Sequence, residues 1–269
     1  MIGTVADTAL PPPSPRPAHR PVPARVRAWC TARDAGRDAG RGRPGSRWWS
    51  SAPRGAGGEL ALRRDGAHYE IISNGVFLMD TRNGESERLL VRAATEGLDG
   101  PVRVLIGGLG VGFSLAESLT LPGVEHVTVV EREPAVIGWH ATALRPWSAG
   151  ALDDPRVTVE CADLLAFVAD PGDRRFDALC LDIDNGPDWT VTPGNARLYA
   201  RGGLDALAGL LTPRGVLAVW SANAAPVFES LLSDRFARVE ARPVPVPRGE
   251  PDVVYLAAEP RPAAGPTPE

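Results

Sequence analysis

The sequence predicts an α/β fold in which a doubly wound, mostly parallel seven-stranded sheet follows a small N-terminal β-hairpin domain. Three observations support this prediction. From residue 101 onward, short apolar and β-branched runs alternate with segments of helical periodicity, as buried strands alternate with helices. The first of these runs leads through a glycine-rich turn into a helix, which is typical of a nucleotide-binding unit. Before it, an Asn-Gly pair separates two short apolar runs, which indicates a hairpin.

The expected elements follow in chain order. The hairpin places strands at 68–72 and 76–80, and a helix with one apolar face follows at 86–94. The next strand, 102–106, enters the glycine-rich turn and the helix at 113–119. The remaining strands are expected at 127–131, 157–161, 176–182, 216–220, 238–241 and 253–257, and the remaining helices begin near 133, 164, 201 and 223.

Composition divides the 269 residues into four parts. Residues 1–58 contain nine prolines, and ten arginines against three acids, without apolar periodicity. Such a segment buries too little surface to offset its ordering entropy, so we expect a disordered tail. Residues 59–100 form the hairpin domain, residues 101–258 form the sheet domain, and residues 259–269 form a second tail.

Charge argues against a nucleic-acid partner for the folded part of the chain. Residues 59–269 contain thirty acidic residues and nineteen arginines, so this part of the chain carries a net negative charge. The arginine-rich tail keeps one alternative open, because Trp48 and Trp49 are able to stack on bases. A solvated tail, or translated sequence upstream of the true start, explains the same composition.

Several classes of protein are not indicated. The chain contains no apolar run of roughly 18 residues, so we expect no membrane span. Prolines interrupt the N-terminus where a signal peptide would need an apolar core, and the cysteines, Cys30, Cys161 and Cys180, are widely separated. We therefore expect a cytoplasmic protein with buried thiols and without a metal site.

The glycine-rich turn carries the first candidate binding residues, Gly108, Gly110 and Gly112. Glycine is required where the backbone has a positive φ and where a ligand lies against it. The dinucleotide fingerprint G-x-G-x-x-G fails here because Phe113 occupies its third glycine position, which leaves NAD as a minor alternative. The pattern G-x-G-x-G resembles motif I of the class I S-adenosylmethionine-dependent transferases. This resemblance implies that the turn passes under the methionine and ribose parts of the ligand.

Two acidic residues at strand ends are further candidates for nucleoside binding. Glu131 lies nineteen residues beyond Gly112, about the spacing at which a carboxylate accepts both ribose hydroxyls. A solvated strand end is the alternative for Glu131. Asp163 follows the next strand, where the resemblance implies a contact with the adenine amino group, and it is also a good N-cap for the helix after it.

Asp182 and Asp184 are the candidate catalytic residues. They follow the strand expected at 176–182, and ligands of doubly wound sheets bind at the carboxyl ends of the strands. Carboxylates at that edge suit a cationic ligand and an amine that must lose a proton before it reacts.

The order of a hairpin domain, a glycine turn and acidic strand ends resembles the spermidine synthase (polyamine aminopropyltransferase) family, over about residues 60–258. The resemblance implies a class I methyltransferase-like fold, and decarboxylated S-adenosylmethionine as the co-substrate with a small amine as acceptor. It also implies that Asp182 takes the proton of the attacking amine. The loop 184–199 corresponds to a lid over the site, with Trp189 as its apolar cover.

The chain departs from the family pattern in two places. The turn at 107–112 has no acidic residue, whereas aminopropyltransferases usually carry one as G-G-G-D-G-G. The segment 84–88 lacks the family's aromatic residue and ends in Arg88, so we expect repulsion of a dication such as putrescine. A methyltransferase that uses S-adenosylmethionine and another small acceptor, and a non-catalytic nucleoside-binding protein, therefore stay open, as does a homodimer.

Overall fold

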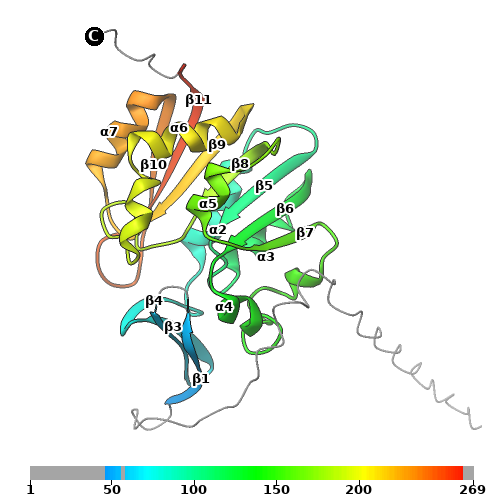
Figure 1. The fold of residues 1–269 in the computed structure, drawn as a ribbon, viewed down its shortest axis with the longest axis vertical. Coiled ribbons are helices and arrows are strands. Elements are labelled where there is room, and N and C mark those ends of the chain that lie inside the picture. The colour runs from blue at the N-terminus through cyan, green and yellow to red at the C-terminus, as the bar shows by residue number, and fades with distance from the viewer. Residues whose placement is uncertain (1–45, 56–57, 263–269) are drawn as a thin grey trace, which may run out of the picture.

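The computed structural model describes residues 46–55 and 58–262, which form two sheets and the helices that cover the larger one (Figure 1). The smaller, N-terminal sheet is antiparallel, with the strand order β1-β2-β3-β4. Its strands are β1 (Ser46–Gly55), β2 (Gly58–Asp65), β3 (His68–Ser73) and β4 (Val76–Asp80). The predicted hairpin is confirmed: Asn74 and Gly75 link β3 to β4 with φ values of 50° and 79°.

The larger sheet has seven strands in the order β10-β11-β9-β8-β5-β6-β7. Its strands are β5 (Val102–Gly107), β6 (Val124–Glu131), β7 (Val157–Cys161), β8 (Phe176–Leu181), β9 (Leu211–Ser221), β10 (Phe236–Val244) and β11 (Asp252–Pro260). Strands β5 to β9 are parallel to one another, and β11 runs antiparallel to both β9 and β10. The predicted doubly wound, mostly parallel seven-stranded sheet is therefore confirmed.

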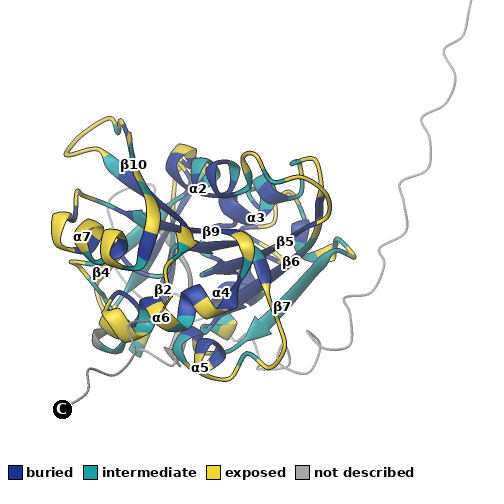
Figure 2. Ribbon diagram, turned by 90° about the horizontal axis from the view of Figure 1, so that it is seen from above, coloured by how far each residue is buried: buried dark blue, intermediate teal, exposed yellow. Residues whose placement is uncertain are grey.

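Helices cover both faces of this sheet, as Figure 2 shows with the buried strands between them. The helices are α2 (Glu85–Thr95), α3 (Phe113–Ser118), α4 (Pro134–Trp139), α5 (Leu164–Ala169), α6 (Arg201–Leu210) and α7 (Pro226–Arg235), with short 3-10 turns at Ala151–Asp153 and Pro193–Arg197. Fully buried residues such as Leu90 of α2 and Leu207 of α6 belong to separate apolar clusters on the two faces. The helix expected from residue 223 begins only at Pro226, because a proline disfavours the helical conformation in the residue that precedes it.

The sheet reverses its winding between β5 and β8. From β5 the chain proceeds outward through β6 and β7, and from β8 it proceeds in the opposite direction through β9. The two strand ends are joined, since Gly107 pairs with Leu181 and the Asp182 amide donates to the Gly107 carbonyl over 2.9 Å. Such a switch point is where doubly wound sheets bind ligands.

The expected tail boundaries need correction. Residues 46–55 form β1, which pairs with β2, so the expectation of disorder over 1–58 is wrong for this segment. β1 has no apolar periodicity of its own and is defined by its pairing with a later strand, a non-local contact that local patterning does not reveal. Strand β11 extends to Pro260, into the expected second tail, while residues 1–45 and 263–269 lie outside the described residues. Within the described ranges, no helix is long and apolar enough to cross a membrane.

Candidate active site

A cavity of about 600 Å³ lies at the switch point, between the N-terminal sheet and the carboxyl ends of the parallel strands. Its volume falls in the range of small-molecule sites, roughly 300–1,000 Å³. Six of the seven predicted site residues line it, namely Gly108, Gly110, Glu131, Asp163, Asp182 and Asp184. The N-terminal sheet contributes apolar side chains such as Ile71, Phe77 and Met79. The fold therefore brings together residues from four strand ends.

The glycines of the turn are required for different reasons. Gly108 has a φ of +91°, and a Cβ there would lie 2.1 Å from the Asp182 carbonyl oxygen. Gly110, with a φ of +49°, faces the Met79 sulfur in the cavity wall. Gly112 precedes α3 with a φ of +93° and packs against His140, outside the cavity lining. Its predicted contact with the nucleoside is thus not supported, and its requirement is one of packing.

Glu131 is buried, with 7% of its surface exposed. Its Oε2 accepts the Leu109 amide over 2.9 Å and its Oε1 accepts the Glu133 amide over 2.8 Å. Burial raises the pKa of this carboxyl, and the two amide donors oppose that shift. The alternative of a solvated strand end is wrong. The carboxylate fixes the glycine turn to the end of β6. Each oxygen keeps a further lone pair, and Glu131 lines the cavity.

His140 supports the same turn from behind, and nothing in the sequence pattern indicated it. The ring is 1% exposed, and its Nε2 lies 2.9 Å from the Gly110 carbonyl, which only accepts. Nε2 therefore carries the hydrogen, and Nδ1 has no hydrogen-bond partner among the described residues. Burial lowers the pKa of His140 to about 4, because protonation would bury a charged ring.

Asp163 combines the two roles that its position suggested. It is the N-cap of α5, with its Oδ1 accepting the Ala166 amide over 3.2 Å. It also lines the cavity next to Leu164. The cap is an observed interaction, and the adenine contact stays a prediction.

Asp182 lies in the cavity wall directly after β8. Its pKa is raised well above the ordinary value by burial and by the negative charges of Glu87, Asp252 and Asp184. In its ionised form, a carboxylate whose pKa is raised is a stronger proton acceptor than an exposed one.

Asp184 holds the loop that follows it. Its Oδ1 accepts the amides of Val191 and Thr192, over 2.9 and 3.2 Å, and its Oδ2 accepts the Asn195 side-chain amide over 2.8 Å. These bonds fold the segment expected as a lid, whose Trp189 is 54% exposed at the cavity wall. Asp184 is thus a positioning residue for that loop, because both of its side-chain oxygens accept hydrogen bonds from it.

Two further acids line the cavity, and their negative charges contribute to the raised pKa of Asp182. Glu87 lies in the first turn of α2, and Asp252 begins β11. The Ser86 hydroxyl lies 3.0 Å from Glu87 Oε2 and 2.7 Å from Asp252 Oδ2. Neither acid was among the predicted site residues, and no sequence signal joins Asp252 to Ser86, which lies 166 residues away.

Arg88 does not face the cavity, which corrects the expected repulsion of a dication. Its guanidinium lies 4.4 Å from the Phe113 ring centroid and within 4.0 Å of Glu117. The arginines that line the cavity are Arg82, Arg132 and Arg248. Of these, Arg82 forms ion pairs with acids of the N-terminal sheet.

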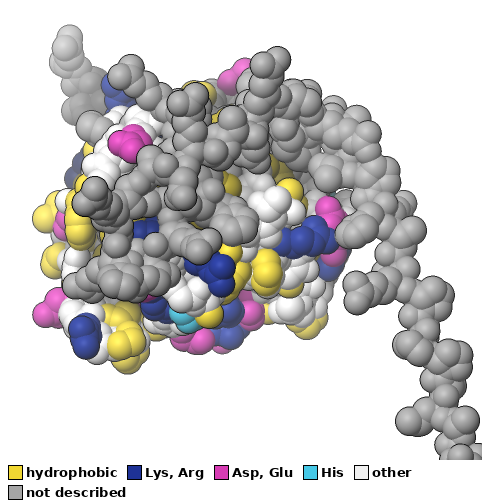
Figure 3. Space-filling view, turned by 90° about the horizontal axis from the view of Figure 1, so that it is seen from below, with side chains coloured by type: hydrophobic (Ala, Val, Ile, Leu, Met, Phe, Trp, Pro, Cys, Tyr) yellow, Lys and Arg dark blue, Asp and Glu magenta, His cyan; other side chains and the backbone are white. Residues whose placement is uncertain are grey.

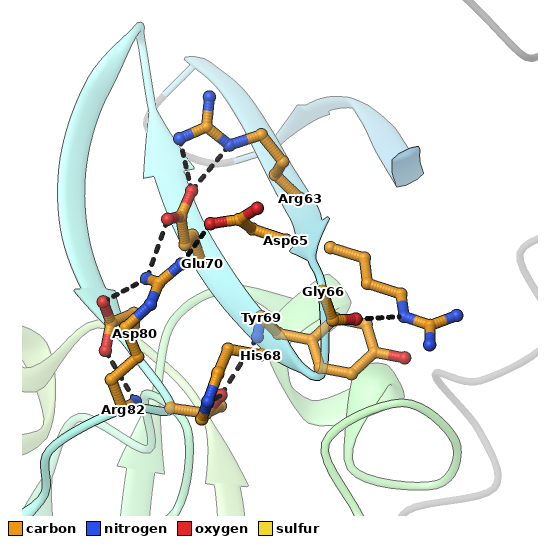
Figure 4. Close-up of polar contacts among 10 residues, drawn as sticks. Arg63, Asp65, Gly66, His68, Tyr69, Glu70, Asp80 and Arg82 are labelled. Atoms are coloured by element: carbon orange, nitrogen blue, oxygen red, sulfur yellow. Dashed lines mark hydrogen bonds and ion pairs between the residues drawn. The ribbon is translucent and has the colours of Figure 1, made fainter. Parts of the chain in front are cut away.

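Figure 4 shows that network: Arg82 bonds to Asp80, Glu70 and Asp65, and Glu70 also pairs with Arg63. Strands β2, β3 and β4 are thereby tied together beside the cavity.

On the face seen in Figure 3, arginines lie among acidic and hydrophobic side chains and are not gathered in one basic patch. Among the described residues, no cluster of three or more His, Cys, Asp or Glu side chains is arranged to hold a metal ion.

Comparison with known proteins decides the family. The model of the spermine/spermidine synthase domain matches residues 86–233, more than half of the chain. The chain belongs to this family. The matched residues include the glycine turn, Glu131 and Asp182, so part of the cavity lining lies in the segment that matches the family model.

Individual relatives cover part of the chain. A polyamine aminopropyltransferase of Mycobacterium tuberculosis is 34% identical over 165 residues, which are 60% of this chain and 30% of that protein. Putrescine N-methyltransferase 2 of Nicotiana attenuata is 28% identical over 161 residues, 59% of this chain and 42% of that protein. The crystal structure of spermidine synthase from Thermotoga maritima has a TM-score of 0.63 at 19% identity, covering 78% of this chain and 72% of that one. The chain thus spans less than half the length of these two curated relatives, and the solved structure shows a shared fold.

Proposed function

We propose that the protein is a transferase that binds a nucleoside of the S-adenosylmethionine type and transfers an aminopropyl group from it to a small amine. The nucleoside would be decarboxylated S-adenosylmethionine, a substrate whose sulfonium centre makes the transferred carbon electrophilic. The observation that carries this proposal is Asp182, a carboxyl with a raised pKa at the floor of a cavity that also contains a glycine turn.

The cavity has features that suit a nucleoside. The turn at Gly108 presents backbone without a Cβ, and Glu131 offers oxygen lone pairs at the end of β6. Asp163 and Leu164 also line the cavity, and together they offer a polar group beside apolar surface, as a purine base requires. No phosphate-binding cradle is needed for such a ligand, which agrees with the failed dinucleotide fingerprint.

Asp182 would act on the acceptor. An amine is protonated at neutral pH, and it must lose a proton before its lone pair displaces the sulfonium substituent. Asp182 accepts that proton, and the loop held by Asp184 limits the access of water to the transfer. General-base assistance of this kind is worth about 10²–10⁴-fold in rate.

Methyl transfer from S-adenosylmethionine to an amine is the second candidate. Two observations favour it: the glycine turn has no acidic residue that would pair with an aminopropyl ammonium, and one relative is named as a putrescine N-methyltransferase. Both reactions use the same fold and the same proton acceptor.

The test is an incubation of the full chain with putrescine and either nucleoside, followed by mass spectrometry of the amine and nucleoside products. Aminopropyl transfer yields spermidine and 5′-methylthioadenosine from the decarboxylated substrate. Methyl transfer yields N-methylputrescine and S-adenosylhomocysteine and would replace the proposal by its alternative. Absence of both products with putrescine and with a panel of other primary amines would refute both candidates.

A further inference from the structure

The glycine turn contains one peptide unit that its own hydrogen bonds do not fix. The Gly112 amide donates to the Leu109 carbonyl over 2.9 Å, which closes a β-turn with Gly110 and Val111 at its centre. The φ angle is positive at Gly110 and not at Val111, as in a type II′ turn. The peptide unit between these two residues takes no part in the closing bond, so another contact must hold it in one orientation.

His140 supplies that contact. Its Nε2 donates to the Gly110 carbonyl over 2.9 Å, and its ring carbon Cε1 would lie 2.7 Å from a Cβ at Gly112. Met79 of β4 also packs against Gly110. Gly110 lines the cavity and His140 does not, so the hydrogen bond directs the Gly110 carbonyl toward a group outside the cavity lining.

The other half of this peptide unit is the Val111 N–H. The unit is trans, and its C=O and N–H therefore point in opposite directions, which turns the N–H away from His140. Val111 is fully buried, and its N–H donates to no group within the described part of the chain. Because buried N–H groups are almost always paired, we expect a ligand of the adjoining cavity to accept this hydrogen bond.

Helix α4 connects this contact to the carboxylate predicted to bind ribose. The helix begins directly after Glu133, whose amide donates to Glu131 Oε1, and it ends directly before His140. Glu131 Oε2 accepts the Leu109 amide. The two ends of one six-residue helix thus hold two different peptide units of the glycine turn.

We propose that His140 is a positioning residue for nucleoside binding, which holds the Gly110 carbonyl so that the Val111 N–H donates to an oxygen atom of the nucleoside. This inference rests on the proposed function, in which the cavity binds a nucleoside of the S-adenosylmethionine type. Without the donor at His140 the peptide unit can rotate and present its carbonyl to the ligand oxygen. Two acceptors form no hydrogen bond, so the affinity falls although His140 does not touch the ligand.

Calorimetry with 5′-methylthioadenosine tests this role on the full chain without requiring turnover. His140→Phe removes the donor and keeps an aromatic ring. We expect its affinity to be lower by roughly fivefold to thirtyfold, which corresponds to the loss of one hydrogen bond to a buried group. His140→Gln keeps a donor for the Gly110 carbonyl and should restore most of the affinity.

Ser148→Ala is the matched control. Ser148 is buried and packs against Gly112 beside His140, but its hydroxyl donates to the Arg145 carbonyl and not to the turn. Its substitution disturbs the packing behind the turn and leaves the bond to the Gly110 carbonyl in place. The affinity for 5′-methylthioadenosine should therefore change by less than about twofold.

A second measurement uses the wild type and does not depend on the folding of His140→Phe. Hydrogen exchange of the Val111 amide, followed by NMR, should slow when 5′-methylthioadenosine binds, because the ligand then accepts its hydrogen bond. In His140→Gln the same slowing should be observed.

An affinity of folded His140→Phe equal to that of the wild type, or a loss that His140→Gln does not reverse, would overturn the inference. A loss of the same size in Ser148→Ala would also overturn it, because the effect would then be one of general packing. So would a rate of Val111 exchange that is the same in the free and the bound wild type. A wild type that binds the nucleoside but forms no transfer product would instead refute the proposed function alone.

Discussion

Replacing Glu131 by Gln tests how the glycine turn and the nucleoside depend on one carboxylate. In the native chain the two oxygens accept the amides of Leu109 and Glu133. The Gln carbonyl replaces one of these acceptors. The Gln amino group is a donor and faces the other buried N–H, so that hydrogen bond is lost. The loss is about 1.5–3 kcal/mol, the value of one hydrogen bond to a charged group.

The substitution has two measurable consequences. It also removes the charge that is predicted to accept the ribose hydroxyls, a contact of similar worth, about 1.5–3 kcal/mol. Calorimetry should therefore show nucleoside affinity lower by about tenfold to a hundredfold, because each 1.4 kcal/mol is a factor of ten. Thermal unfolding should begin earlier by about 2–4 °C per kcal/mol, because the carboxylate holds the turn even without ligand. Glu125→Gln is the control, since Glu125 is exposed on the same strand β6. Unchanged affinity together with unchanged stability in Glu131→Gln would refute the reasoning.

Two further predictions concern the same turn. Gly108→Ala should abolish nucleoside binding and lower thermal stability, because its Cβ would lie 2.1 Å from the Asp182 carbonyl oxygen at a φ of +91°; normal binding in calorimetry would show that the turn relaxes. The pKa of His140 is about 4 in the fold and 6.5 in the unfolded chain, so the unfolded state binds the proton first and the free energy of unfolding falls as pH drops from about 6.5 to 4. Denaturant titrations at several pH values should show that His140→Gln, which keeps a donor for the Gly110 carbonyl, lacks this component; identical pH profiles would contradict it.

Local patterns in the sequence were sufficient for much of the fold. The apolar run at 102–106 and the Asn74-Gly75 turn each determine local geometry, and both elements form as expected. Because parallel strands end at one edge of the sheet, Glu131 and Asp182 could also be placed together from the sequence.

The features of the site that could not be predicted from the sequence depend on long-range packing. Ser86 meets Asp252 only because α2 packs beside β11, and no periodicity encodes that contact. Arg88 points away from the cavity because Phe113 and Glu117 lie on its side of the helix. The glycine spacing likewise does not distinguish Gly112, which packs against His140, from Gly108 and Gly110, which line the cavity.

The most direct test of the central claim is the turnover of Asp182→Asn with the amine and nucleoside that the wild type uses. Asn keeps the shape of the side chain but does not accept the proton of the attacking amine. We predict that kcat falls by about 10²–10⁴-fold, while the nucleoside affinity measured by calorimetry changes by less than about threefold. Turnover equal to that of the wild type would contradict the assignment of Asp182 as proton acceptor.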